Sequence, residues 1–213
     1  MLATASASYS SRGSSPSPGL PMAVVRPRPV TFHASGSEIY AQGEKSGSLY
    51  RIESGAVRIY RLLTDGRRQV VAFHVQGETF GFEAWGCRSF YAEAIVPTGL
   101  TSIEAEGNEI HRGELMALAL RSMIRAQEHL LVVGRQSALE KLAVFLVDLD
   151  RRQGDVGIID LPMTRTDIGD YLGMTVETVS RSMSRLREKG IVRLKNARCI
   201  EIVRRDKLQA ISE

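Results

Sequence analysis

The chain has 213 residues, of which 43% are hydrophobic and 24% charged, enough for one large or two modest globular domains. No apolar run approaches the roughly 18 residues that cross a bilayer, so we expect no membrane partner. Two cysteines, Cys87 and Cys199, are too few for a disulfide framework or a four-thiolate metal or iron–sulfur site, and they favour a reducing, cytoplasmic location.

Positive charge is concentrated in the last quarter of the chain. Residues 161–213 contain eleven Lys and Arg against seven Asp and Glu, an excess that equals the formal charge of the whole chain, +4. This asymmetry indicates a polyanionic partner for the C-terminal segment.

Residues 1–30 differ in composition from the rest of the chain. They hold five of the seven prolines, seven serines and no acidic residue. A segment of this kind buries too little apolar surface to fold, so we expect a disordered tail.

Residues 31–108 predict an antiparallel β-barrel or sandwich. Apolar and polar residues alternate on both sides of a turn at Ser54–Gly55, and "TDGRR" (64–68) predicts a hairpin turn before the strand "QVVAFHV". Glycines interrupt the segment every four to eleven residues between residues 43 and 86. Many short strands with glycine turns are typical of this architecture.

Residues 109–136 predict a long central helix. The stretch "ELMALALRSMIRAQEHLLVV" contains no glycine or proline, and its apolar residues recur at intervals of three, four and seven. Such a helix needs a partner, which could be its own barrel or the same helix of a second subunit. The expected dimer interface consists of Met116, Leu120, Met123, Ile124 and Leu131.

The segment 137–213 predicts a winged helix-turn-helix. Ser137 and Glu140 can form a capping box at the start of an amphipathic helix. Two further helices follow, capped by Thr164 and Thr175 and ended by glycines at 173 and 190. "IVRL" and "CIEIV" then predict a two-stranded wing with a turn near position 196.

The second of these helices has the chemistry of a DNA recognition helix. Val179, Met183 and Leu186 mark its buried side, so the other side is free for a partner. There Glu177 can accept a hydrogen bond from a cytosine amino group, and Arg181 can bind guanine O6 and N7 with two hydrogen bonds. The expected base-contacting residues are Glu177, Ser180 and Arg181, with Ser184 on the same face. A solvated helix face is the simpler alternative.

Four residues near the two helix starts are candidates for phosphate contacts. Hydroxyl groups, backbone N–H groups and a cation at such positions can bind phosphate oxygens. The candidates are Thr164, Arg165, Thr166 and Thr175. Simple helix capping is the alternative for the threonines, and a solvated side chain for Arg165.

Across about residues 31–210 the chain resembles the CRP/FNR superfamily of bacterial transcription regulators. The resemblance lies in "EIYAQGEKSGSLYRIESGAVRIYRL", "QGETFGFEAWG" and "MTRTDIGDYLGMTVETVSRSMSRLREKGIV". Within the superfamily, "GETFGFEA" followed by "AEA" looks most like the FixK branch, which governs low-oxygen and nitrogen-fixation genes.

The resemblance implies an α+β fold. Its parts are a cyclic-nucleotide-binding-type antiparallel β-barrel (a jelly roll), a central dimerisation helix and a winged helix-turn-helix. It also implies a homodimer that binds palindromes and contacts RNA polymerase, most often as an activator. The spacing of Glu177, Ser180 and Arg181 is similar to that of regulators that bind TTGA-N6-TCAA-like sites.

Three sensing mechanisms are alternatives for such a chain: an iron–sulfur cluster, cyclic AMP binding and cysteine oxidation. The N-terminal tail lacks the thiolates of an iron–sulfur cluster, and Ala126–Gln127 replaces the family's adenine-contacting Thr-Ser pair. "GE" (77–78) and "RS" (88–89) superficially match the family's phosphate-binding elements, but we expect Arg88 to be a surface residue in a turn.

Cys199, beside Arg198 on the wing, is a possible redox site, although burial as a small apolar residue is the simpler reading. We therefore expect no cofactor and no effector, with a cyclic-nucleotide-responsive activator as the alternative.

A cupin-like metal enzyme is a remote alternative for the barrel. Metal-binding barrels of that kind need clustered His and Glu ligands on adjacent strands. The four histidines, at 33, 74, 111 and 129, are scattered singly. We therefore expect no metal site and no catalytic residues.

Overall fold

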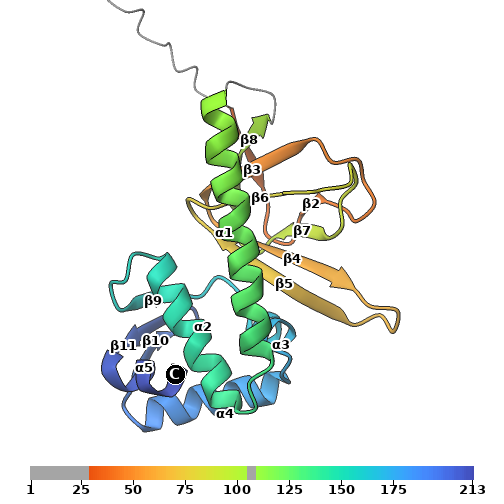
Figure 1. The fold of residues 1–213 in the computed structure, drawn as a ribbon. Coiled ribbons are helices and arrows are strands. Elements are labelled where there is room, and N and C mark those ends of the chain that lie inside the picture. The colour runs from red at the N-terminus through yellow and green to blue at the C-terminus, as the bar shows by residue number, and fades with distance from the viewer. Residues whose placement is uncertain (1–28, 105–108) are drawn as a thin grey trace, which may run out of the picture.

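The computed structural model describes residues 29–104 and 109–213. The tail expected over residues 1–30 lies outside these residues, apart from its last two. Figure 1 shows a unit of strands, a second unit of short helices and strands, and one long helix, α1 (Glu109–Val133), that runs beside both.

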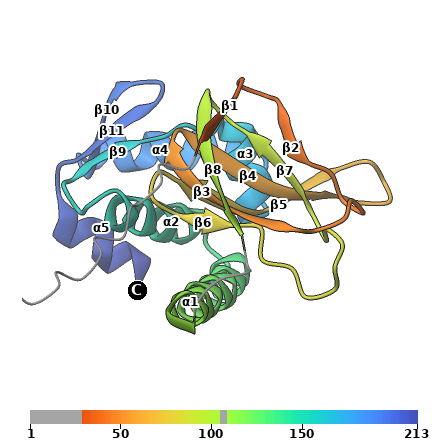
Figure 2. The ribbon, with the colours of Figure 1, turned by 90° about the horizontal axis from the view of Figure 1, so that it is seen from above.

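The N-terminal unit contains two antiparallel sheets. Its strands are β1 (Val30–His33), β2 (Glu38–Tyr40), β3 (Ser48–Ser54), β4 (Ala56–Leu62), β5 (Arg68–Val75), β6 (Thr79–Phe80), β7 (Tyr91–Ala94) and β8 (Thr98–Glu104). In the described residues the strand orders are β1-β8-β3-β6 and β2-β7-β4-β5. Figure 2 shows the two sheets facing each other, which is the predicted jelly-roll arrangement.

The alternating pattern of the strands produces a core between the sheets. Ile52 and Leu100 project from one sheet and Val57 and Ile59 from the other, and all four are buried. The predicted turns at Ser54–Gly55 and at 64–68 join β3 to β4 and β4 to β5, so both are confirmed.

The C-terminal unit contains the predicted helices and a small sheet. Its elements are α2 (Ala138–Arg152), β9 (Ile158–Asp160), α3 (Arg165–Leu172), α4 (Val176–Glu188), β10 (Val192–Asn196), β11 (Cys199–Ile202) and α5 (Arg205–Ser212). The prediction of a two-stranded wing was incomplete, because β9 pairs with β11 to make the order β10-β11-β9. Helix α5 was not predicted either. Ser137 caps α2 as predicted, because its hydroxyl oxygen accepts a hydrogen bond from Glu140 N (3.4 Å). The other half of the predicted capping box is not formed: the Glu140 carboxylate lies 4.0 Å from the Arg135 guanidinium.

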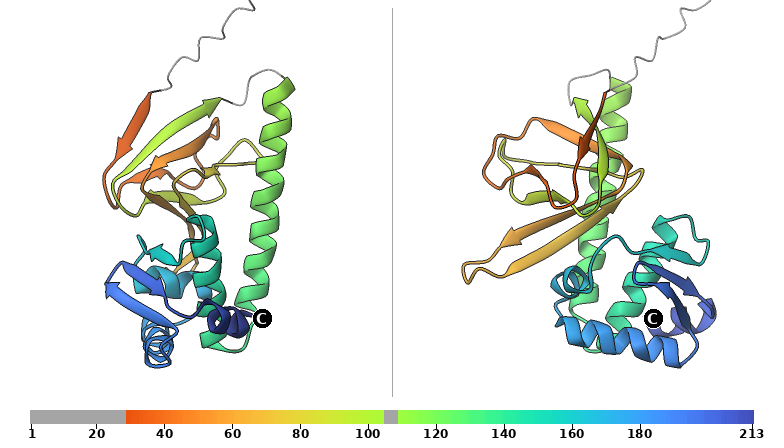
Figure 3. Two further views of the ribbon diagram at one scale, coloured as in Figure 1. Left: turned by 90° about the vertical axis from the view of Figure 1, so that its left-hand side faces the viewer. Right: turned by 180° about the vertical axis from the view of Figure 1, so that it is seen from behind.

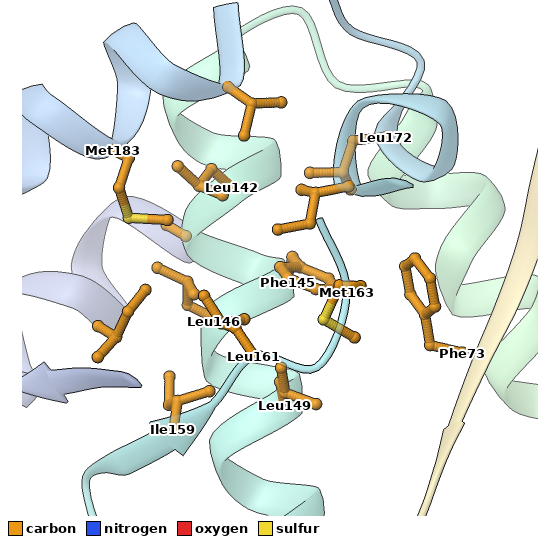
Figure 4. Close-up of a cluster of buried hydrophobic side chains, with 14 of the residues drawn as sticks. Phe73, Leu142, Phe145, Leu146, Leu149, Ile159, Leu161, Met163, Leu172 and Met183 are labelled. Atoms are coloured by element: carbon orange, nitrogen blue, oxygen red, sulfur yellow. The ribbon is translucent and has the colours of Figure 1, made fainter. Parts of the chain in front are cut away.

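The core of the C-terminal unit extends to the barrel. Leu142, Leu146 and Met183 meet at its centre, and Phe73 of β5 points toward the same cluster (Figure 4). The Phe73 ring lies 6.3 Å from that of Phe145, between centroids. Because these side chains pack without interruption, the N-terminal unit and the C-terminal unit share an apolar boundary.

Helix α1 covers 25 residues but is too polar to be a membrane segment. None of the helices among residues 29–104 and 109–213 combines the length and apolar character that a bilayer crossing requires. Figure 3 shows α1 running along one side of both units.

Candidate DNA-binding surface

The helix-turn-helix is built from local signals. Thr164 caps α3 in a full capping box with Asp167, and Thr175 caps α4 by accepting a hydrogen bond from Thr178 N (3.3 Å). Gly173 ends α3 in the left-handed conformation (φ 65°), which glycine adopts without steric cost. Both predicted helices are therefore confirmed, with bounds within one residue or so of expectation.

Gly169 fixes the approach of α3 to the turn, and sequence reasoning missed it. A Cβ atom at this position would lie 2.6 Å from the Met174 carbonyl oxygen. No side chain fits at that distance, so the angle between α3 and α4 depends on this glycine. A glycine inside a short helical pattern was the signal that could have indicated the close approach.

Helix α4 divides into a buried and a free face, as predicted. Val179, Met183 and Leu186 are each at most 1% exposed. Glu177 and Arg181 are exposed on the opposite face, and Ser180 and Ser184 are partly exposed there. The structure therefore places the predicted base-contacting side chains together, on a helix whose other face anchors it to the protein.

A chain of hydroxyl groups supports Arg181. Arg181 Nη2 donates to Thr178 Oγ1 (3.5 Å), and Thr178 Oγ1 lies 3.1 Å from Thr175 Oγ1. Thr178 was not among the predicted site residues. Within the described residues this long hydrogen bond is the only one that the Arg181 side chain makes, so most of its five N–H donors are available to an acceptor.

Glu177 carries its charge at neutral pH. Hydrogen bonds from its own backbone N–H and from the Thr175 hydroxyl, together with nearby Arg181, lower the pKa of Glu177 below its ordinary value. A carboxylate that is ionised can only accept hydrogen bonds, which suits the amino group of cytosine and disfavours the O6 of guanine.

The candidate phosphate-contacting residues lie at the starts of α3 and α4. Thr164, Thr166 and Thr175 are exposed, and Arg165 is partly exposed. The Thr164 hydroxyl is already engaged, since it donates to Asp167 Oδ2 (2.7 Å) and accepts from Asp167 N (3.1 Å). The structure therefore gives the Thr164 side chain a capping role, while Arg165 and Thr166 remain candidates for binding an anion.

The wing carries further positive charge next to α4. Arg193 and Lys195 of β10 flank Glu201 of β11, at 3.1 and 3.9 Å, and Arg198 is exposed in the turn. Cys199, the possible redox residue, is half-buried at the start of β11.

The predicted dimer-interface residues form an exposed apolar stripe along α1. Ile124 is 50% exposed and Leu131 is 75% exposed, and Leu130 (70%), which was not predicted, extends the stripe. Exposing a contiguous apolar surface of this length to water is unfavourable, and such surfaces mark sites of protein–protein interaction. The other predicted residues, Met116, Leu120 and Met123, are exposed as well.

Arg88 is buried, so the expectation of a surface arginine was wrong. Its side chain is 4% exposed, and its guanidinium donates to the carbonyl oxygens of Gly81 and Ser48, both at 2.7 Å. It also lies 4.1 Å from the centre of the Tyr40 ring. One of these carbonyl groups, that of Ser48, is 40 residues away in the sequence, so no local pattern indicates the burial.

Glu78, from the other superficial phosphate-binding match, is also engaged inside the protein. Arg152 donates to both of its carboxylate oxygens (2.9 and 2.8 Å), and Arg125 lies 3.1 Å away. These partners and His74, 3.4 Å away, hold the pKa of Glu78 far below its usual range although burial opposes them.

Two hollows lie between the barrel and α1. The inner one has a volume of about 250 Å³ and is lined by Tyr40, Phe80 and Ala126 among others. The outer one, about 840 Å³, is lined by mostly small and apolar residues, with Glu83 as its charged side chain. Among the described residues no group of three or more His, Cys, Asp or Glu could hold a metal ion.

Comparison with known families agrees with this architecture. The model of the cyclic nucleotide-binding domain matches residues 30–109, and that of the Crp-like helix-turn-helix domain matches residues 140–211. A barrel of the first type joined to a helix-turn-helix of the second defines a DNA-binding transcription regulator.

Individual relatives are more specific. The chain is 52% identical over 185 residues to the nitrogen fixation regulation protein FixK of Rhizobium meliloti, which covers 87% of this chain and 88% of that protein. It is 37% identical over 195 residues to FixK of Azorhizobium caulinodans, and this alignment covers 86% of this chain and 78% of that protein. The structure of FixK2 from Bradyrhizobium japonicum superposes with a TM-score of 0.82 at 37% identity, covering 88% of this chain and 98% of that one. The chain belongs to the CRP/FNR family.

Proposed function

We propose that this regulator is a homodimer that binds TTGA-N6-TCAA-like palindromes and contacts RNA polymerase, most often as an activator. The regulated genes would include nitrogen-fixation genes, as the names of its FixK relatives suggest. We extend the proposal to low-oxygen genes because of the resemblance to the FixK branch. In this proposal residues 31–108 form the barrel domain, 109–136 the dimerisation helix and 137–213 the DNA-binding domain, in the cytoplasm.

The observation that carries the proposal is the two-sided character of α4. Its apolar side is buried, while Glu177 and Arg181 are exposed. In the part of the chain that the structure describes, no partner occupies all of their hydrogen-bonding groups. One subunit presents one such helix, and a palindrome needs two in fixed register. The apolar stripe on α1 is the surface that supports pairing.

We further propose that DNA binding needs no small-molecule effector. The Arg88 side chain is 4% exposed, and both of its Nη atoms donate to backbone carbonyl groups, so a phosphate would have to displace these hydrogen bonds to reach it. The inner hollow, about 250 Å³, is smaller than the roughly 300–1,000 Å³ of typical ligand pockets. In the outer one the Glu83 carboxylate would repel a phosphate.

The purified protein should therefore bind a TTGA-N6-TCAA duplex with no nucleotide added. Calorimetric titration with cyclic AMP and with cyclic GMP should give no heat beyond dilution, and neither nucleotide should change the affinity for the duplex. Heat of binding together with tighter DNA binding would instead establish the cyclic-nucleotide-responsive activator. Metal analysis of the same preparation addresses the cupin-like alternative, which requires a stoichiometric metal ion.

A further inference from the structure

The helix-turn-helix is tied to the barrel by a cluster of charged side chains. Helix α3 packs against β5 (Figures 1 and 3), and there Asp167 is 1% exposed. Its Oδ1 accepts hydrogen bonds from Arg58 Nη1 (2.9 Å) and Arg68 Nη2 (2.6 Å), which come from β4 and β5. Two arginines of the barrel therefore meet on one buried carboxylate of the DNA-binding unit.

The other oxygen of the same carboxylate sets the start of α3. Asp167 Oδ2 accepts from Thr164 N (3.0 Å) and from Thr164 Oγ1 (2.7 Å). A single side chain thus both begins the helix and joins it to the barrel. Any rotation of α3 away from β5 would break hydrogen bonds to charged groups, which are the stronger kind in proteins.

A second contact one turn along α3 prevents rotation about the first. Arg68 donates to Asp170 Oδ2 through Nε (3.1 Å) and Nη2 (2.9 Å). The neighbouring Gln69 donates from Nε2 to the Asp170 carbonyl oxygen (2.6 Å). Two points on one helix define its direction, whereas a single point would leave it free to pivot.

One of the two barrel arginines is itself held in place, because Arg58 Nη2 donates to Glu93 Oε1 on β7 (2.5 Å). An aromatic contact also joins β5 to α3, with the Phe73 ring 5.1 Å from the Tyr171 ring, between centroids. The orientation of α3 is passed to α4 through the close contact at Gly169. The barrel therefore determines where the recognition helix points.

We propose that Arg58 and Arg68 are positioning residues for DNA binding: by fixing α3 on the barrel they set the half-site spacing that the dimer accepts. The inference rests on the proposed function, because spacing has meaning only for a dimer on a palindrome. It also gives a physical reason for effector-independent binding, since these contacts hold the DNA-binding unit in one orientation without a ligand. Neither arginine needs to touch DNA.

Arg68→Met is the most direct test. It removes the contacts to both aspartates, while Arg58 still neutralises the buried Asp167, so the protein should fold. Affinities would be measured on the full chain with duplexes of two half-sites separated by four to eight base pairs, and with a duplex holding one half-site. We expect the preference for the six-base-pair spacer over five or seven to fall by about tenfold, with one-half-site affinity nearly unchanged.

Matched variants separate positioning from general effects. Arg67→Met removes an equal charge from the same hairpin, but its side chain is 78% exposed and pairs with Asp65, so the spacer preference should stay. Arg68→Lys restores the charge and should recover part of the preference. Asp170→Asn, at a partly exposed site outside the capping box, should lower it even if Arg68→Met fails to fold.

The outcomes distinguish this inference from the proposed function. If Arg68→Met and Asp170→Asn keep the wild-type spacer preference, or weaken binding equally at every spacing and at one half-site, the two arginines are not positioning residues. The same holds if Arg67→Met has an equal effect. If the wild-type protein has no spacer preference at all, the proposed palindrome-binding dimer itself is wrong.

Discussion

Replacing Arg181 with alanine is expected to abolish the preference for the palindrome and leave the fold intact. The side chain is exposed and contributes nothing to the buried face of α4, so thermal unfolding should be nearly unchanged. A bidentate arginine–guanine contact is worth about 1–3 kcal/mol, and the dimer loses two of them. Specific binding should therefore weaken by about 2–6 kcal/mol, at least roughly thirtyfold in Kd, as measured by gel shift against a scrambled duplex.

Arg165→Ala is the matched control for this experiment. Arg165 lies at the first position of α3, where a contact would be to phosphate and not to a base edge. Its removal should weaken binding to all sequences alike. The plot of log K against log salt has a negative slope, and its magnitude should decrease by about one per subunit. Wild-type selectivity in the Arg181 variant would show that α4 does not contact the bases as proposed.

Replacing Ile124 or Leu131 with glutamate is expected to give folded monomers that bind DNA weakly. Both side chains are at least half exposed in the single chain, so the fold does not depend on them. A two-fold interface contains each substitution twice. Loss of apolar burial alone should cost about 3–6 kcal/mol per dimer, which raises the dissociation constant of the dimer more than about a hundredfold.

Arg121→Glu provides the comparison on the same helix. Arg121 is exposed on α1 but lies outside the apolar stripe, so this variant should remain a dimer. Sedimentation velocity measures the oligomeric state directly, and anisotropy with the palindrome measures the effect on binding. An unaltered sedimentation profile for both stripe variants would mean that the interface lies elsewhere.

The helix-turn-helix was predictable because its signals are local. The threonine caps and the glycine stops lie within a few residues of the helix ends that they determine, and the helix period separates Val179 from Arg181. The barrel strands were predictable for the same reason, since the turns at Ser54–Gly55 and 64–68 lie between alternating runs.

What the sequence did not indicate depends on distant partners. Strand β9 has three residues, and it is a strand because β11 pairs with it about forty residues later. The burial of Arg88 depends on the carbonyl group of Ser48, 40 residues away. The contact of Arg58 with Asp167 spans 109 residues, so no motif or period could have revealed the charged cluster between the two units.

The central claim is that two α4 helices of a symmetric dimer contact the same base sequence in opposite directions. Selection of bound duplexes from a random pool by the purified protein, with no nucleotide added, measures sequence, symmetry and spacing together. We predict enrichment of an inverted repeat close to TTGA-N6-TCAA, with its half-sites centred about one helical turn apart. Enrichment of a single asymmetric site, or no enrichment over the starting pool, would contradict the claim.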